Sequence, residues 1–101
     1  MTDDKRNEER RTVNLDVRWD GMTGIYEARL EDISLVGCFI NTTGEVEIGQ
    51  EINLEICLPS GEWMRLSGTV TWHQVAVGFG MRFAPLSEPE QAAVKELLAA
   101  R

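Results

Sequence analysis

The chain has 101 residues, 43% of them hydrophobic, and its 17 acidic and 10 basic side chains give a formal net charge of -7. This length fits one domain, and the hydrophobic content predicts a folded globule rather than a disordered chain. The acidic balance argues against a general DNA- or RNA-binding protein, whose affinity comes largely from Lys and Arg at phosphates. It leaves room for a small anionic ligand held by a few local arginines.

The first residues are charged throughout, unlike a signal peptide, and no apolar run approaches the ~20 residues needed to cross a bilayer. The sequence therefore predicts a cytoplasmic protein without membrane insertion. Cys38 and Cys57 each lie in an apolar segment and are expected to be reduced core thiols. A disulfide between them would require neighbouring strands, which leaves that pairing open.

Residues 1–11 contain no apolar side chain beyond the initiator methionine, so this segment is expected to be a flexible tail. It carries four of the 10 basic residues, namely Lys5, Arg6, Arg10 and Arg11. Residues 12–101 are expected to form the folded domain.

Alternation of apolar and polar residues predicts strands over 12–19, 25–33, 50–59, 63–73 and 75–83, with a short apolar strand over 38–40. The phase of the alternation shifts near Asp32, which predicts a bulge or bend there. In the later strands Trp72, Val75 and Val77 are expected to point inward. The glycines on the opposite face of the last strand, at 78 and 80, indicate that the N-terminal strand or a ligand packs closely there.

A helix is predicted over about 87–99, because Ser87 and Glu90 have the spacing of a capping box and Val94, Leu97 and Leu98 form an apolar stripe. Six sequential strands joined by short turns favour a closed or nearly closed antiparallel β-barrel. The expected fold is therefore all-β with one C-terminal helix, which covers one end or one face of a six-stranded barrel.

The segment 32–37 offers a polar pair for binding. Residues two apart in an extended segment point to the same face, so Asp32 and Ser34 are expected to face outward together while Ile33 faces the core. Gly37 then allows the backbone to turn. Taken alone, this pattern also fits a polar strand edge.

The residues for catalysis are missing from the sequence. His73, the one histidine, lies in a predicted strand, and no Ser or Cys has a credible neighbouring base. The sequence contains no metal-binding, Walker or dinucleotide-binding motif. We therefore expect neither enzyme activity nor a metal or cofactor.

A binding function fits the arginines better. Arg6 and Arg10 have RxxxR spacing, and the guanidinium fork suits phosphate oxygens and the O6/N7 edge of guanine. Asp32 can accept from the N1 and N2 donors of guanine or orient an arginine, and Ser34 can donate to a phosphate or base. Together the tail and the sheet face could enclose a small guanine nucleotide.

With these motifs the chain resembles the PilZ domain family, which binds cyclic di-GMP. The residues that carry the resemblance are RxxxR at 6–10 and DxSxxG at 32–37, with weaker matches at 68–72, 77–83 and the capped terminal helix. The resemblance implies a six-stranded barrel with a C-terminal helix. It also implies that the arginines clasp guanine and phosphate while the 32–37 motif contacts the ligand from the barrel surface.

Three further residues are candidates by the same resemblance. Some members place a residue that stacks near the ligand at the position of Trp72, although its inward phase is equally consistent with a core role. In some members a basic residue at the position of Lys5 favours an intercalated ligand dimer, so one or two ligand molecules stay open. Arg11 follows the second motif arginine directly and is the third candidate.

The expected function is a cyclic di-GMP receptor, as a monomer or weak dimer, whose tail becomes ordered over the barrel and signals to a partner protein. The alternative is an adaptor of the same fold that contacts proteins without binding nucleotide. The residues between the two arginines, Asn7, Glu8 and Glu9, and the acidic net charge make this alternative plausible, although the acidic neighbours are expected to weaken nucleotide binding rather than abolish it. A barrel that binds single-stranded nucleic acid is disfavoured by the charge.

Overall fold

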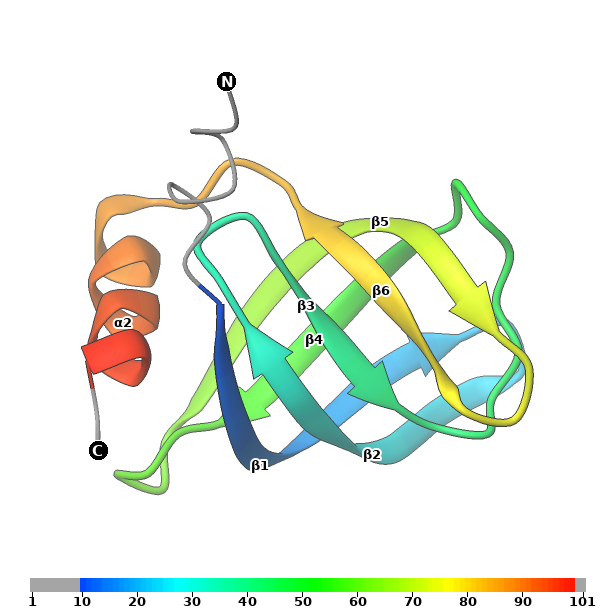
Figure 1. Cartoon of the computed structure of the whole chain (residues 1–101), viewed down its shortest axis with the longest axis horizontal. Coiled ribbons are helices and arrows are strands. Elements are labelled where there is room, and N and C mark those ends of the chain that lie inside the picture. The colour runs from blue at the N-terminus through cyan, green and yellow to red at the C-terminus, as the bar shows by residue number, and fades with distance from the viewer. Residues whose placement is uncertain (1–9, 100–101) are drawn as a thin grey trace.

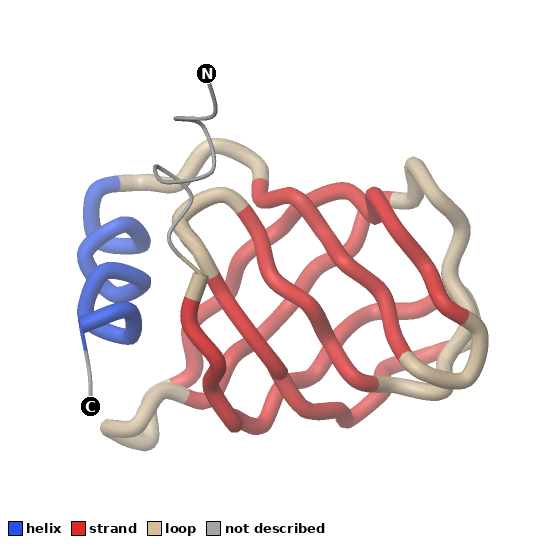
Figure 2. The backbone as a smooth tube through the Cα atoms, viewed as in Figure 1, coloured by secondary structure: helices blue, strands red, loops and turns tan. Residues whose placement is uncertain are grey.

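The computed structural model describes residues 10–99 (Figure 1). Six strands precede one helix along the chain: β1 (Arg11–Gly21), β2 (Gly24–Ile33), β3 (Gly37–Asn41), β4 (Glu51–Cys57), β5 (Trp63–Gln74), β6 (Gly78–Phe83) and α2 (Glu88–Ala99). The strands form the barrel wall and the helix stands at one end of it (Figure 2).

All neighbouring strands are antiparallel, in the closed order β1-β2-β3-β6-β5-β4. The pairing of β3 with β6 and of β1 with β4 joins strands that are distant in sequence, and β1 with β4 closes the barrel. The expected six-stranded antiparallel barrel with a C-terminal helix is therefore confirmed.

The barrel interior is filled by the apolar face of each strand, as the alternation predicts. Trp19 and Phe79 are among the largest fully buried side chains, and Val94 and Leu97 of α2 join the same core. Because these two helical residues are buried, α2 closes its end of the barrel (Figure 1). The free energy gained from this burial, rather than helix propensity, stabilises a helix of only 12 residues.

The capping box predicted for α2 is present. The backbone N–H of Ser87 donates to Glu90 Oε1 at 2.9 Å, and the backbone N–H of Glu90 donates to Ser87 Oγ at 3.3 Å. These two bonds satisfy backbone donors that have no partner within the first turn. Both cysteines are free: Cys38 is buried, as expected, whereas Cys57 is only partly buried.

Two bulges decide which side chains face outward near the site. The predicted irregularity near Asp32 is confirmed, since the β2–β3 register shifts between Leu30 and Asp32. A second register shift, between Val70 and Trp72 on β5, turns Trp72 outward, and its side chain is 50% exposed. The inward phase expected for Trp72 is therefore wrong, because a bulge inserts an extra residue into the alternation.

The predicted strand over 75–83 begins later than expected. Strand β6 starts at Gly78, and Val75 and Val77 lie in the preceding hairpin turn, 72% and 43% exposed. The turn is formed where the backbone N–H of Val77 donates to the carbonyl of Gln74 at 3.0 Å and Ala76 adopts a left-handed φ of 64°. The inward orientation expected for both valines is wrong, because a turn interrupts the alternation.

Candidate functional site

The second motif arginine contacts the first residue of the 32–37 motif. Arg10 Nη1 lies 3.2 Å from Asp32 Oδ1, although the two residues are 22 positions apart. The β1–β2 register explains the meeting, because Thr12 pairs with Asp32 and so places the residues just before β1 beside the end of β2. The Arg10 side chain is half exposed, at 50%, and its remaining guanidinium donors can reach a ligand.

Asp32 is held in a partly desolvated position. Burial raises the pKa of its carboxyl group, Arg10 lowers that pKa, the nearby Glu31 raises it, and a hydrogen bond with the backbone of Phe39 lowers it. The net pKa lies above the ordinary value because desolvation disfavours the charged form more than its partners favour it. A donor from a ligand would relieve that cost, as expected of a binding group.

Ser34 does not face outward with Asp32. Its side chain is fully buried, and its Oγ accepts from the backbone N–H groups of Val36 at 3.1 Å and Gly37 at 3.2 Å. The same hydroxyl donates to the Gly37 carbonyl at 3.3 Å. The expected shared face is wrong because β2 ends at Ile33, so strand alternation no longer applies at the next residue. In this position Ser34 shapes the β2–β3 turn.

Gly37 has a packing role in the same turn. It pairs with Arg82 across β3 and β6, and a Cβ added to it would overlap the backbone carbonyl oxygen of Met81. Only glycine allows the two strands to approach so closely. Ser34 and Gly37 therefore build the turn, and Asp32 is the residue of the motif that stands on the outer surface.

An outward-facing row crosses four strands beside Asp32. Cross-strand pairs join Asp32 to Phe39, Phe39 to Gly80, and Gly80 to Trp72, so that the row runs from β2 through β3 and β6 to β5. The Phe39 and Trp72 rings face each other across Gly80, with centroids 5.4 Å apart at an interplanar angle of 45°. Because Gly80 has no side chain, it leaves an aromatic surface next to the Arg10–Asp32 pair. We call these four residues the outer row.

Sequence reasoning missed Phe39, although it had singled out Gly78 and Gly80 as a place where the N-terminal strand or a ligand packs closely. Phe39 reads as one residue of a short apolar strand, and only the β3–β6 register places it between Asp32 and Trp72. One available signal was the glycine pair in the last strand. Strand packing explains the glycine at position 78, because a Cβ there would overlap the Ile40 carbonyl oxygen. It does not explain the glycine at position 80, where a Cβ would meet its nearest atoms at 3.8 Å.

The other predicted site residues do not all lie beside Asp32 in the structure. Arg11 is turned toward the helix, where its Nη1 donates to the Leu98 carbonyl at 3.3 Å, so it ties the start of β1 to α2 instead of joining Asp32. Lys5 and Arg6 lie outside the described residues. Within residues 10–99, therefore, Arg10 contacts Asp32, Trp72 lies at the far end of the same outer row, and Ser34 and Gly37 are buried in the β2–β3 turn beside Asp32.

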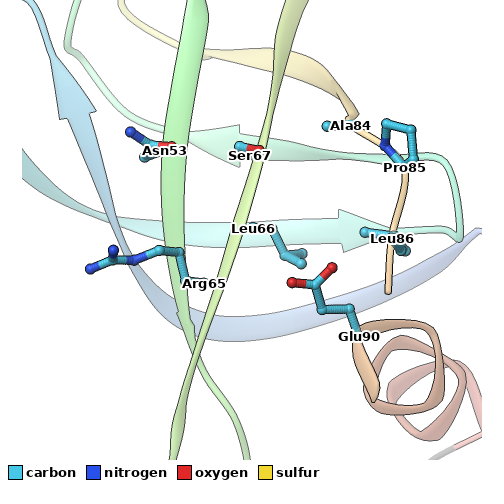
Figure 3. Close-up of a pocket in the computed structure, with 8 residues that line it drawn as sticks. All are labelled: Asn53, Arg65, Leu66, Ser67, Ala84, Pro85, Leu86 and Glu90. Atoms are coloured by element: carbon cyan, nitrogen blue, oxygen red, sulfur yellow. The ribbon is translucent and has the colours of Figure 1, made fainter. Parts of the chain in front are cut away.

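One hollow elsewhere on the surface uses its polar side chains in contacts within the protein. It has a volume of about 320 Å³ and lies between β4, β5 and the start of α2, and its lining includes Arg65 and Glu90 (Figure 3). Arg65 is paired with Glu55 at 3.1 Å, and Glu90 belongs to the capping box of α2. Neither side chain needs a ligand, so this hollow offers less chemistry than the outer row.

Between Arg10 and Ala99 no group of three His, Cys, Asp or Glu side chains is placed to hold a metal ion. In that same stretch, no helix has the length and apolar character needed to span a bilayer.

The fold and the sequence were compared with known proteins. The family model of the PilZ domain matches residues 4–100. The fold is similar to the Bacillus subtilis inhibitor of motility, MotI/DgrA, with a TM-score of 0.76 and 15% identity over 93% of this chain. It is also similar to the PilZ domain of CeSA from a cellulose-synthesizing bacterium, with a TM-score of 0.69 and 16% identity over 89% of this chain and 94% of that one.

At these identities the structural likeness shows the fold alone. This chain spans about half, 49%, of the MotI/DgrA chain. No curated protein matches the sequence significantly. The family match, in contrast, covers nearly the whole chain and coincides with a barrel that brings Arg10 of the RxxxR spacing into contact with Asp32 of the 32–37 motif. The chain belongs to the PilZ domain family.

Proposed function

We propose that this chain is a cyclic di-GMP receptor that holds the dinucleotide against the outer row, between Arg10 and Trp72. Cyclic di-GMP binding is the role of the PilZ family, and PilZ domains are receptor or adaptor domains. The observation that carries the proposal is the 3.2 Å contact between Arg10 and Asp32, because it unites motif halves that are far apart in sequence.

The chemistry of the outer row suits a guanine nucleotide. Arg10 can donate to guanine O6 and N7 or to phosphate oxygens, and Asp32 can orient that guanidinium or accept from guanine N1 and N2. The exposed ring of Trp72 and the partly buried ring of Phe39 offer a face for stacking, a contact worth ~1–3 kcal/mol per base. Hydrogen bonding and stacking then act on the same base from adjacent strands.

The proposal assigns the first motif arginine to the same ligand. Arg6 precedes Arg10 by four positions, so residues 1–9 are close enough along the chain to reach a dinucleotide on the outer row. Ligand contact would order this segment and change the surface that a partner protein meets. Hydrogen exchange of residues 2–10 with and without cyclic di-GMP measures this step, and unchanged exchange on ligand saturation would refute it.

Calorimetry with cyclic di-GMP tests the receptor function directly. Arg10→Ala and Asp32→Asn should each weaken binding about 10–100-fold, because each removes a charge-assisted hydrogen bond worth ~1.5–3 kcal/mol. Arg65→Ala is the matched control, since Arg65 is also an exposed arginine in an ion pair, 3.1 Å from Glu55 on a different part of the barrel. Thermal stability of the ligand-free variants should change little, because exposed ion pairs contribute ~0–1 kcal/mol.

Two results would contradict the receptor function. One is an absence of heat at high ligand concentration, and the other is equal affinity of the Arg10→Ala and Arg65→Ala variants. The first result would favour the adaptor alternative, in which the barrel contacts proteins without nucleotide. Glu8 and Glu9, between the two motif arginines, are the feature of the chain that supports that alternative.

A further inference from the structure

The end of the barrel away from α2 carries most of the exposed apolar side chains. Three connections meet there: the β1–β2 turn, the β3–β4 loop and the β5–β6 turn (Figure 1). Seven large hydrophobic residues are exposed in the described chain; four of them lie on these connections, and a fifth, Ile25, is the second residue of β2, directly after the β1–β2 turn. We call these five the loop-end surface: Met22, Ile25, Ile48, Val75 and Val77.

Hydrogen bonds tie the β3–β4 loop to the β5–β6 turn and to β1. The backbone N–H of Thr42 donates to the Val77 carbonyl at 3.1 Å, which ties the β3–β4 loop to the β5–β6 turn. Thr42 Oγ1 accepts from Trp19 Nε1 at 3.3 Å, which ties the same loop to β1. Gly44 lies so close to the Trp19 ring that a Cβ would collide with it. The start of the β3–β4 loop and the β5–β6 turn are therefore held against the barrel, which lowers the entropy lost when a partner binds there.

The β5–β6 turn departs from ordinary turn chemistry. A hairpin turn with a residue at positive φ normally has Gly, Asn or Asp there, but this turn reads Val75-Ala76-Val77 and Ala76 has a φ of 64°. The left-handed conformation costs an alanine ~1–2 kcal/mol, and the two exposed valines contribute little to the core. An unfavourable backbone together with exposed apolar side chains indicates that this turn serves contact with another molecule.

The charge around the loop-end surface indicates the kind of partner. Segments 19–26, 41–50 and 74–78 contain three carboxylates, Asp20, Glu45 and Glu47, and no lysine or arginine. Within residues 10–99 none of the three forms an ion pair. A second copy of this chain would bring like charges together, and an anionic membrane would repel them.

We propose that the loop-end surface docks a partner protein that presents apolar side chains among lysines and arginines. Apolar contact would supply affinity, and the three carboxylates would steer and select a basic partner. The five residues of the loop-end surface are not part of the outer row, and they lie at the end of the barrel opposite the β2–β3 turn and α2 (Figure 1), so the inference does not depend on nucleotide binding.

Two synthetic amphipathic helical peptides test the proposal on the full chain. One carries leucine and lysine, and the other carries leucine and glutamate in the same positions. Titration of isotope-labelled protein by NMR should show the lysine peptide shifting amides of residues 20–25, 42–49 and 74–78, with the glutamate peptide inactive. A Val75→Ser/Val77→Ser double variant should lose about tenfold or more in affinity, because it removes two apolar anchors from the contact.

Trp63→Ser is the matched control, because it removes an exposed apolar side chain from outside the three connections and should keep the affinity for the lysine peptide. Equal affinity for the two peptides, shifts elsewhere on the barrel, or undiminished binding by the double variant would overturn the proposal. So would sedimentation that shows a dimer lost in the double variant, or binding of phosphatidylglycerol vesicles through these loops. Repeating the titration with cyclic di-GMP present separates this result from the receptor function.

Discussion

Replacing Ser34 with alanine separates two roles for the hydroxyl of the 32–37 motif. If Ser34 contacts ligand, the substitution should reduce affinity and leave the free protein unchanged. In the structure the hydroxyl is fully buried and accepts from the N–H groups of Val36 and Gly37. The alanine variant would leave those donors without a partner in a turn that water reaches poorly. We therefore expect the main effect on the stability of the ligand-free protein.

The size of the effect follows from the hydrogen bonds that are lost. An unsatisfied buried donor costs ~1–3 kcal/mol, and the N–H of Val36 is only partly buried, so a total loss of about 2–3 kcal/mol is expected. For a domain of this size, 1 kcal/mol shifts the melting temperature by ~4–8 °C, which predicts a decrease of about 10–20 °C. The free energy of unfolding of a typical domain, ~5–15 kcal/mol, leaves the variant folded for the measurement.

Urea unfolding and differential scanning calorimetry of Ser34→Ala measure the loss. Ser60→Ala is the matched control, since Ser60 Oγ also accepts a backbone N–H, that of Glu62 at 3.3 Å, but in an exposed turn where water can replace it. The control should stay within about 0.5 kcal/mol of the wild type. A Ser34→Ala variant as stable as the control would refute the structural role of the hydroxyl and return it to the ligand.

Gly37→Ala should destabilise the barrel by about 3 kcal/mol or more, because the added Cβ would overlap a backbone oxygen of the facing strand. Gly80→Ala should change the free energy of unfolding by less than about 1 kcal/mol, because a Cβ there would meet its nearest atoms at 3.8 Å. Urea unfolding of the two variants measures this contrast, and equal stabilities would contradict the packing. Asp32→Asn should keep or raise the stability of the ligand-free protein at neutral pH, because burial raises the pKa of this carboxyl above its unfolded value and so penalises the ionised form. The wild type should gain stability relative to this variant as the pH falls through the raised pKa, which unfolding curves at several pH values would show, and a variant less stable at neutral pH would contradict it. In the native protein Cys57 should react with a thiol reagent, because its side chain is partly exposed. Cys38 should react only after unfolding, because it is buried and burial raises its pKa. Equal rates of modification of the two cysteines in the native protein would refute this.

The fold could be predicted from the sequence because most of its signals are local. Alternation located five of the strands and a short apolar run located β3, the capping box located the start of α2, and the shift of phase near Asp32 located the β2–β3 bulge. The errors arose where a local pattern was extended beyond its element. Val75 and Val77 continue the alternation of β6 in sequence, but a turn ends the strand before it reaches them.

The site could be predicted only in part, because its geometry depends on pairing between distant strands. The spacing of RxxxR and DxSxxG predicted Arg10 and Asp32 as candidates, and the structure places them in contact. Phe39 could not be selected, because the β3–β6 and β5–β6 registers that set it beside Trp72 leave no mark within either segment. The burial of Ser34 depends on the residue at which β2 ends, and strand boundaries are poorly specified by local pattern.

The division of labour within the 32–37 motif bears on the choice between receptor and adaptor. Ser34 and Gly37 stabilise the turn and would be useful to the barrel whether or not it binds a ligand. Asp32 is different, because burial destabilises its charged form and the interaction with the half-exposed Arg10 offsets only part of that free energy. A barrel that served only as an adaptor would gain nothing from a desolvated carboxylate beside Arg10. The feature that favours a receptor is therefore the Arg10–Asp32 pair, and a PilZ sequence that retained only the serine and glycine of the motif would carry no such indication.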